Sequence, residues 1–194
     1  MSDAFTFDDV CRARAETIVG RYPEGRQQSA VIPLLDLAQR QAGGWLPTEA
    51  IEYVAGYLDM PKIRVLEVAS FYSIFNLEPV GKNFVQLCRT TPCWLRGSDD
   101  LRAVAKDVTG CGLGETSPDG AFTVVEVECL GACCNAPMVQ INDDYYEDLT
   151  ADSFRVVLEA LKCGETPETG SQSGRKGSEP AGELTSLNGV GKGA

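Results

Sequence analysis

The sequence predicts an α+β protein in two parts: an N-terminal helical bundle over residues 1–79 and an α/β domain with a four-stranded sheet over residues 80–164. Two observations support this division. Apolar residues recur at helical spacing up to residue 79, whereas short segments typical of strands dominate the stretch that follows. From residue 165 to residue 194, Gly, Ser, Glu and Pro prevail. Such a composition predicts a disordered tail, because it cannot bury enough apolar surface to offset its ordering entropy.

The first part is expected to contain helices near residues 7–22, 31–42, 48–58 and 61–69. Pro23 stops the first helical pattern, and a pair of glycines ends the second. Thr48 is predicted to cap the third helix, and Pro61 suits the first turn of the fourth.

The second part is predicted to follow the order β-α-β-β-α. This order predicts a four-stranded sheet that is covered by helices. The expected elements are a strand at 83–88, a helix at 98–108 capped by Ser98, strands at 122–129, 138–141 and 145–147, and a helix capped by Thr150. Thr123, Val125 and Val127 share one face of the second strand, and residues 142–144 are expected to form a hairpin turn.

Composition excludes several classes of function. The net charge of −11 disfavours binding to nucleic acid or to an anionic membrane surface. No stretch approaches the roughly 20 apolar residues that span a bilayer, and the N-terminus lacks the features of a signal or transit peptide. We therefore expect a cytoplasmic protein without direct membrane contact. The chain has no histidine, which excludes a Ser-His or Cys-His nucleophile and a Rieske centre.

Cys88, Cys93, Cys129 and Cys133 form two close pairs, each expected at the end of a strand. Loops that leave the same end of a sheet can converge, so the two pairs could meet around one metal centre. Four thiolates are the usual ligands of a [2Fe–2S] cluster, and the spacing is also compatible with structural zinc. A disulfide is disfavoured in a reducing compartment.

The other four cysteines carry weaker expectations. Cys134 adjoins a candidate ligand but is expected to be a packed small hydrophobe rather than a fifth ligand. Cys11, Cys111 and Cys163 have no close cysteine partner in the sequence.

The segments CRTTPCWLRGS (88–98) and ECLGACCNAPMVQINDDYYEDLT (128–150) resemble the small [2Fe–2S] subunit of the NADH-dehydrogenase module of respiratory complex I. The resemblance extends over roughly residues 5–165. It is close to the mitochondrial subunit, and because no transit peptide is expected here, it indicates a bacterial relative of that subunit. It implies that a thioredoxin-like domain follows the helical bundle. It also implies that Cys88, Cys93, Cys129 and Cys133 hold one [2Fe–2S] cluster.

The resemblance further implies a function. The chain would be an electron-transfer subunit of NADH:quinone oxidoreductase that exchanges single electrons with the FMN of a neighbouring flavoprotein subunit. It would contact other complex I subunits too, at the cytoplasmic side of the bacterial inner membrane. We expect no NADH or FMN site in the chain itself, because the glycines at 110–114 lack the dinucleotide-binding spacing and are expected to cap a helix.

The helical bundle is expected to dock the flavoprotein. A DNA-binding helix-turn-helix over residues 48–72 is rejected, because that stretch carries more acidic than basic residues.

Three alternatives remain at this point. One is the equivalent diaphorase subunit of an NAD-linked hydrogenase or formate dehydrogenase, another is a free-standing thioredoxin-like ferredoxin, and the last is a zinc-stabilised scaffold.

Charges near the ligands predict a cluster of low potential, because anions oppose reduction. In sequence, the acids nearest the second pair are Glu126, Glu128, Asp143 and Asp144, and Arg89 and Arg96 flank the first pair. The alternative is that all six are solvated surface charges.

Overall fold

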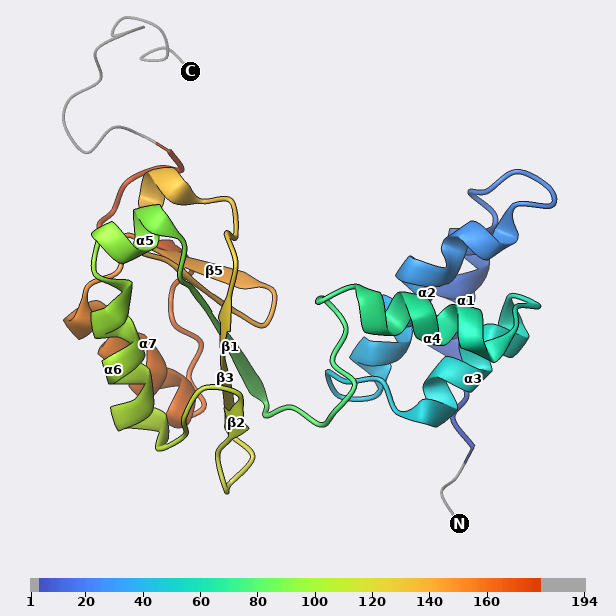
Figure 1. Cartoon of the computed structure of the whole chain (residues 1–194), viewed down its shortest axis with the longest axis horizontal. Helices are drawn as coiled ribbons and strands as arrows, with labels where there is room; N and C mark the ends of the chain where they lie inside the picture. The colour runs from blue at the N-terminus through green and yellow to red at the C-terminus, as the bar shows by residue number, and fades with distance from the viewer. Residues whose placement is uncertain (1–3, 179–194) are drawn as a thin grey trace, which may run out of the picture. The chain divides into compact units, whose positions relative to one another are not determined.

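The computed structural model describes residues 4–178, which divide into two compact units between Val80 and Gly81 (Figure 1). No helix among these residues is long and apolar enough to cross a lipid bilayer.

Within residues 4–80, four α-helices and one 3₁₀ turn make up the first unit. They are α1 (Asp9–Val19), η1 (Gln27–Ala30), α2 (Val31–Gln41), α3 (Thr48–Tyr57) and α4 (Lys62–Phe71). The starts of two helices differ from the prediction. Thr48 is already the first residue of α3, so the extended Pro47 takes the cap position, and Pro61 caps α4 instead of entering its first turn. Both prolines suit these positions. The residue that caps a helix has extended backbone, and its N–H makes no hydrogen bond within the helix, so proline loses nothing there.

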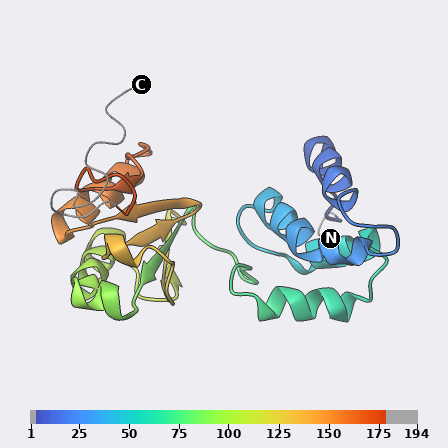
Figure 2. The same ribbon diagram turned by 90° about the horizontal axis from the view of Figure 1, so that it is seen from above.

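The helices of the first unit gather around one apolar core (Figure 2). Leu34, Val54 and Val65 are completely buried there. Phe7 packs edge-on against Tyr53, with ring centroids 5.0 Å apart and an interplanar angle of 81°. Because each helix contributes one apolar face to this core, the unit matches the predicted bundle.

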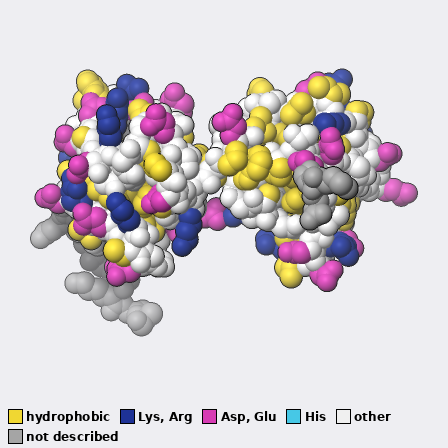
Figure 3. All heavy atoms as spheres, turned by 90° about the horizontal axis from the view of Figure 1, so that it is seen from below, with side chains coloured by type: hydrophobic (Ala, Val, Ile, Leu, Met, Phe, Trp, Pro, Cys, Tyr) yellow, Lys and Arg dark blue, Asp and Glu magenta, His cyan; other side chains and the backbone are white. Residues whose placement is uncertain are grey.

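The surface of the same unit exposes several large apolar side chains (Figure 3). They cluster along α4 and the segment after it, where Ile63, Phe71 and Ile74 are 59%, 80% and 58% exposed. Exposed apolar groups gathered on one element indicate an interaction surface.

Within residues 81–178, one mixed sheet of six strands forms the second unit. Its strands are β1 (Asn83–Cys88), β2 (Glu115–Thr116), β3 (Phe122–Val127), β4 (Val139–Ile141), β5 (Asp144–Glu147) and β6 (Gly170–Ser171), in the spatial order β2-β3-β1-β4-β5-β6. The prediction of four strands was incomplete. The central four strands are the predicted ones, whereas β2 and β6 are two-residue edge strands too short to show an alternating pattern.

The helices of this unit are α5 (Thr91–Leu95), α6 (Ser98–Thr109) and α7 (Ala151–Lys162), and η2 (Cys133–Asn135) is a 3₁₀ turn. Thr150 caps α7 as predicted, through a capping box with Ser153. Ser98 does not cap α6, because Gly97 takes that position with φ +98° and Ser98 is buried in the first turn. Gly110 ends the same helix with φ +74°, as predicted.

Helices α6 and α7 pack side by side on one face of the sheet (Figure 1). Val85 of β1 pairs with Val124 of β3, and both are buried in the core that these helices cover. On β3 the core side is therefore the face of Phe122 and Val124, opposite to the face that Val125 shares.

The strand pairing decides where the cysteines lie. β1 and β3 are parallel neighbours, with Cys88 opposite Val127, so the loops that follow them leave the sheet at the same edge. β4 and β5 form the predicted hairpin, in which Asn142 has φ +55°.

The prediction of disorder from residue 165 was wrong for residues 165–178. β6 pairs in parallel with β5, and Arg175 forms an ion pair with Asp148. These contacts are main-chain hydrogen bonds and charged interactions, which a composition poor in apolar residues does not reveal. Residues 179–194 of the predicted tail lie outside the described part of the chain.

Candidate metal centre

The first pair of candidate ligands is buried in regular structure. Cys88 is the last residue of β1, and Cys93 lies in the short helix α5, which has Pro92 in its first turn. Their exposed fractions are 2% and 1%. Both side chains pack with Ala136 and Met138 in a small apolar cluster, so their positions are fixed by the surrounding core.

The second pair is exposed and lies on irregular backbone. Cys129 follows β3 by two residues, and Cys133 begins the turn η2. Their Sγ atoms are 3.3 Å apart. Between them Gly131 adopts φ +90°, a conformation that favours glycine, and its N–H donates to the Cys129 sulfur over 3.4 Å. The loop therefore turns an amide group toward the sulfur, as a sulfur-ligated cluster requires.

The two pairs converge, as expected from parallel strands. The backbone N–H of Leu130, in the second loop, interacts with the thiol of Cys88 in the first. The side chains of Thr90 and Cys88, in the first loop, also help to lower the pKa of the Cys129 thiol, after the larger effects of Gly131 and Cys133. The ends of β1 and β3 thus place all four sulfurs at one edge of the sheet.

The buried pair has opposite shifts in acidity. Burial disfavours the thiolate of Cys88, but hydrogen bonds from Leu130 and Thr90 outweigh it and lower the pKa of Cys88. Burial, followed by the hydrogen bond to Cys88, raises the pKa of Cys93 to about 12. Because a ligand thiol must be deprotonated, a metal bound here would have to displace the Cys93 proton.

The exposed pair shows the same division of roles. The N–H of Gly131, followed by the thiol of Cys133, lowers the pKa of Cys129. The hydrogen bond to Cys129 raises the pKa of Cys133. Each pair therefore contains one thiol with a lowered pKa and one with a raised pKa, as expected for two thiols that interact at one site.

A family profile described as "Thioredoxin-like [2Fe-2S] ferredoxin" matches residues 15–162. The chain belongs to this family. Two curated relatives, from Rickettsia bellii and Rickettsia conorii, are subunits of NADH-quinone oxidoreductase and are 56% and 58% identical to it. Each alignment covers 158 residues, 81% of this chain and 95% of the relative.

Two further similarities are more distant. The ferredoxin is 49% identical over 184 residues to the mitochondrial NADH dehydrogenase [ubiquinone] flavoprotein 2 of Dictyostelium discoideum, an alignment covering 94% of this chain and 74% of the relative. A solved structure of an NAD⁺-reducing [NiFe]-hydrogenase in the H₂-reduced state aligns with a TM-score of 0.60 at 21% identity, over 68% of this chain and 23% of the hydrogenase chain. At that identity, the second similarity shows the fold alone.

The donor set of this thioredoxin-like ferredoxin fits a [2Fe–2S] cluster. Such a cluster takes four thiolates, and the parallel strands β1 and β3 bring the two cysteine pairs to the same edge of the sheet. Within residues 4–178, no group of three or more Cys, Asp or Glu side chains is arranged to hold a single metal ion. The family profile, which is that of a [2Fe–2S] ferredoxin, favours this cluster over zinc.

Other site predictions have mixed outcomes. Cys134 is exposed and not packed, because its turn lies at the surface. The carboxylate of Glu126 pairs with Arg89 at 2.8 Å and with Arg102 at 3.6 Å, so cations offset the charge of this acid in the ferredoxin.

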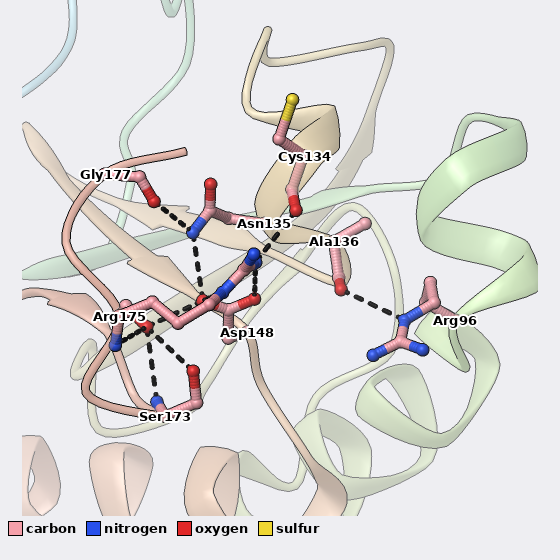
Figure 4. Close-up of polar contacts among 9 residues, drawn as sticks. Arg96, Cys134, Asn135, Ala136, Asp148, Ser173, Arg175 and Gly177 are labelled. Carbon is pink, nitrogen blue, oxygen red and sulfur yellow. Dashed lines mark hydrogen bonds and ion pairs between the residues drawn. The ribbon is translucent and has the colours of Figure 1, made fainter. Parts of the chain in front are cut away.

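Sequence reasoning missed the groups that hold the second ligand loop. The Tyr145 hydroxyl donates to the Leu130 carbonyl over 2.7 Å. Arg96 donates to the Ala136 carbonyl over 3.4 Å (Figure 4). Arg175 reaches the same loop from a segment without any hydrophobic pattern. A single side chain bonded to a distant carbonyl leaves no periodic signal in a sequence.

Proposed function

We propose that this chain is the [2Fe–2S] electron-transfer subunit of the NADH-oxidising module of NADH-quinone oxidoreductase. The observation that carries the proposal is the meeting of two cysteine pairs at the ends of the parallel strands β1 and β3. The Rickettsia relatives, which match nearly throughout their length, are named as subunits of NADH-quinone oxidoreductase.

In the proposed site, Cys88, Cys93, Cys129 and Cys133 hold one cluster. When bound, a [2Fe–2S] cluster accepts and releases one electron at a time. The buried pair fixes its half of the site, and the exposed pair leaves the other half open at the protein surface. Electrons can therefore enter or leave on the side of the second loop.

A partner is proposed to cover this opening. Trp94 and Leu95, next to the buried ligand Cys93, are 58% and 71% exposed. Exposed aromatic and aliphatic residues beside an open redox site are typical of an interface core. We assign the partner as the flavoprotein subunit that binds NADH and FMN, with which this chain exchanges single electrons.

The apolar surface on α4, which includes Ile63 and Phe71, is proposed as a second docking surface for the same assembly. Through these contacts the chain would sit at the cytoplasmic side of the bacterial inner membrane, as a peripheral part of a membrane-bound complex. The equivalent diaphorase role in a hydrogenase receives less support, because that similarity is only 21% in sequence.

The first test is spectroscopy of the full chain purified without oxygen. A [2Fe–2S] cluster predicts about two irons and two acid-labile sulfides per chain, visible absorption, and a rhombic EPR signal after reduction. A colourless protein with one zinc per chain would refute the cluster.

The second test addresses the partner. Co-expression with the candidate flavoprotein should give a complex that survives gel filtration. Substitution of both Trp94 and Leu95 by serine should weaken that complex while the EPR signal persists. A flavoprotein that never co-purifies would favour the free-standing ferredoxin instead.

A further inference from the structure

The chain beyond α7 returns to the sheet and ends beside the second ligand loop. Gly170 and Ser171 of β6 pair in parallel with Tyr146 and Glu147 of β5. The N–H of Gln172 then donates to the Glu147 carbonyl over 2.9 Å. We call residues 165–178 the C-terminal strap. Figure 4 shows its last part next to the turn that begins with Cys133.

Asp148 joins the strap to the sheet. Its carboxylate is 9% exposed and accepts from the Ser171 hydroxyl over 2.6 Å and from Arg175 Nε over 3.1 Å. A second ion-pair contact comes from Arg175 Nη2. Burial opposes ionisation, but the hydrogen bonds from Arg175, Ser171 and Asn135 outweigh it and lower the pKa of Asp148 to about 2. The carboxylate is therefore ionised and fully bonded at neutral pH.

The same groups hold the ligand turn directly. Arg175 Nη2 donates to the Cys134 carbonyl over 2.8 Å. The side-chain amide of Asn135, itself 3% exposed, donates to Asp148 over 2.9 Å and to the Gly177 carbonyl over 2.7 Å. The two residues after Cys133 are thus both bonded to the strap (Figure 4).

These bonds matter because Cys133 lies at the start of a short 3₁₀ turn, where regular secondary structure does not fix its position. Its side chain is exposed and belongs to no long helix or strand. Contacts behind a metal ligand commonly set its orientation, and their loss typically lowers metal affinity about 10–100-fold.

We propose that the C-terminal strap is part of the cluster site, with Arg175 as a positioning residue that fixes the turn carrying Cys133. This inference rests on the proposed function, since it assumes that Cys133 is a cluster ligand. Arg175 acts through backbone geometry, because its charge is neutralised by Asp148. Its planar fork bonds the Asp148 carboxylate and the Cys134 carbonyl together, which an ammonium group cannot reproduce in one position.

The test uses the full chain with its cluster, prepared without oxygen. Arg175→Gln should lose the cluster to an Fe²⁺ chelator about tenfold faster than the wild type, measured as the decay of visible absorption. Its EPR g values should also shift, because the Cys133 sulfur is less well oriented. Arg175→Lys should give an intermediate rate.

Arg155→Gln is the matched control. It removes an ion pair of 2.8 Å between α7 and Asp107 of α6, away from both ligand loops. This variant should keep the wild-type rate of cluster loss and the wild-type g values. Equal acceleration in both variants would mean general destabilisation and would overturn the proposal.

An Arg175→Gln protein with wild-type kinetics and spectrum would also overturn it. If that variant fails to fold, as judged by circular dichroism, Ser171→Ala decides the question. It removes one donor to Asp148, so about threefold faster cluster loss is expected and an unchanged rate refutes the positioning role. A wild-type chain that binds no cluster would instead refute the proposed function itself.

Discussion

The two ligand loops differ in how the protein holds them. Cys88 and Cys93 are almost fully buried, at the end of a central strand and in a helix. Cys129 and Cys133 are exposed, and hydrogen bonds from Tyr145 and the C-terminal strap hold their loop. One half of the site is therefore set by core packing and the other by polar contacts, so the two halves should respond differently to perturbation.

The largest expected effect comes from replacing the ligands one at a time by serine. Every variant should lose most of its cluster, measured as iron per chain. In the metal-free protein, Cys88→Ser and Cys93→Ser should lower the free energy of unfolding by about 1–3 kcal/mol, because a hydroxyl replaces a buried thiol. The exposed Cys129→Ser and Cys133→Ser should stay within about 0.5 kcal/mol of the wild type. Equal decreases in the free energy of unfolding at all four positions would contradict the difference between the loops.

Removing the cluster should loosen the second loop more than the first. With a chelator and reductant, amide exchange over residues 129–135 should accelerate on the order of tenfold. Exchange over residues 88–95 should change less, because Ala136 and Met138 still pack against those cysteines. Hydrogen–deuterium exchange with mass spectrometry measures both segments in one experiment, and uniform acceleration would argue against separate support.

Acid should weaken the support of the second loop specifically. The pKa of Asp148 is lowered to about 2 from an ordinary value of 3.8. A lowered carboxyl pKa adds stability that is complete above the ordinary value and is lost as pH falls through the folded value. Between about pH 4 and pH 2, the metal-free wild type should therefore lose stability more steeply than Asp148→Asn.

Urea denaturation at several pH values measures this slope. The chain has two tryptophans, so a Trp45→Phe background leaves Trp94 as the reporter of the second unit. Parallel slopes in the two proteins would show that Asp148 does not carry the acid dependence.

The smallest expected effect concerns the reduction potential. A low reduction potential of the cluster remains a prediction. A redox titration followed by EPR should give a negative midpoint potential. Arg89→Gln removes a cation next to Cys88 and leaves Glu126 with only the longer contact to Arg102. The midpoint should fall by on the order of tens of millivolts, with less change at high salt. Arg155→Gln serves as the distant control, and a rise in potential at Arg89→Gln would contradict the charge argument.

Most of the second unit's architecture was predictable because its central strands carry regular patterns. The hairpin at Asn142 and the cap at Thr150 follow local rules of turns and helix ends. The edge strands β2 and β6 were missed because two residues cannot show a period. The caps at Thr48 and Ser98 were misplaced by one residue, since neighbouring proline and glycine satisfied the backbone better.

The sequence by itself determined the identity and pairing of the candidate ligands. Four cysteines in two close pairs, without histidine, predict a thiolate-ligated site, and the family profile over residues 15–162 is that of a [2Fe–2S] ferredoxin. The tertiary structure decided which pair is buried, and it brought Asp148 and Arg175 to the turn that carries Cys133. The spacing of the cysteines and the composition are properties of the linear sequence, so they are known without the structure. The bonds of Arg175 to Asp148 and to Cys134 join residues 27 and 41 positions apart in the sequence, which meet only when the sheet forms.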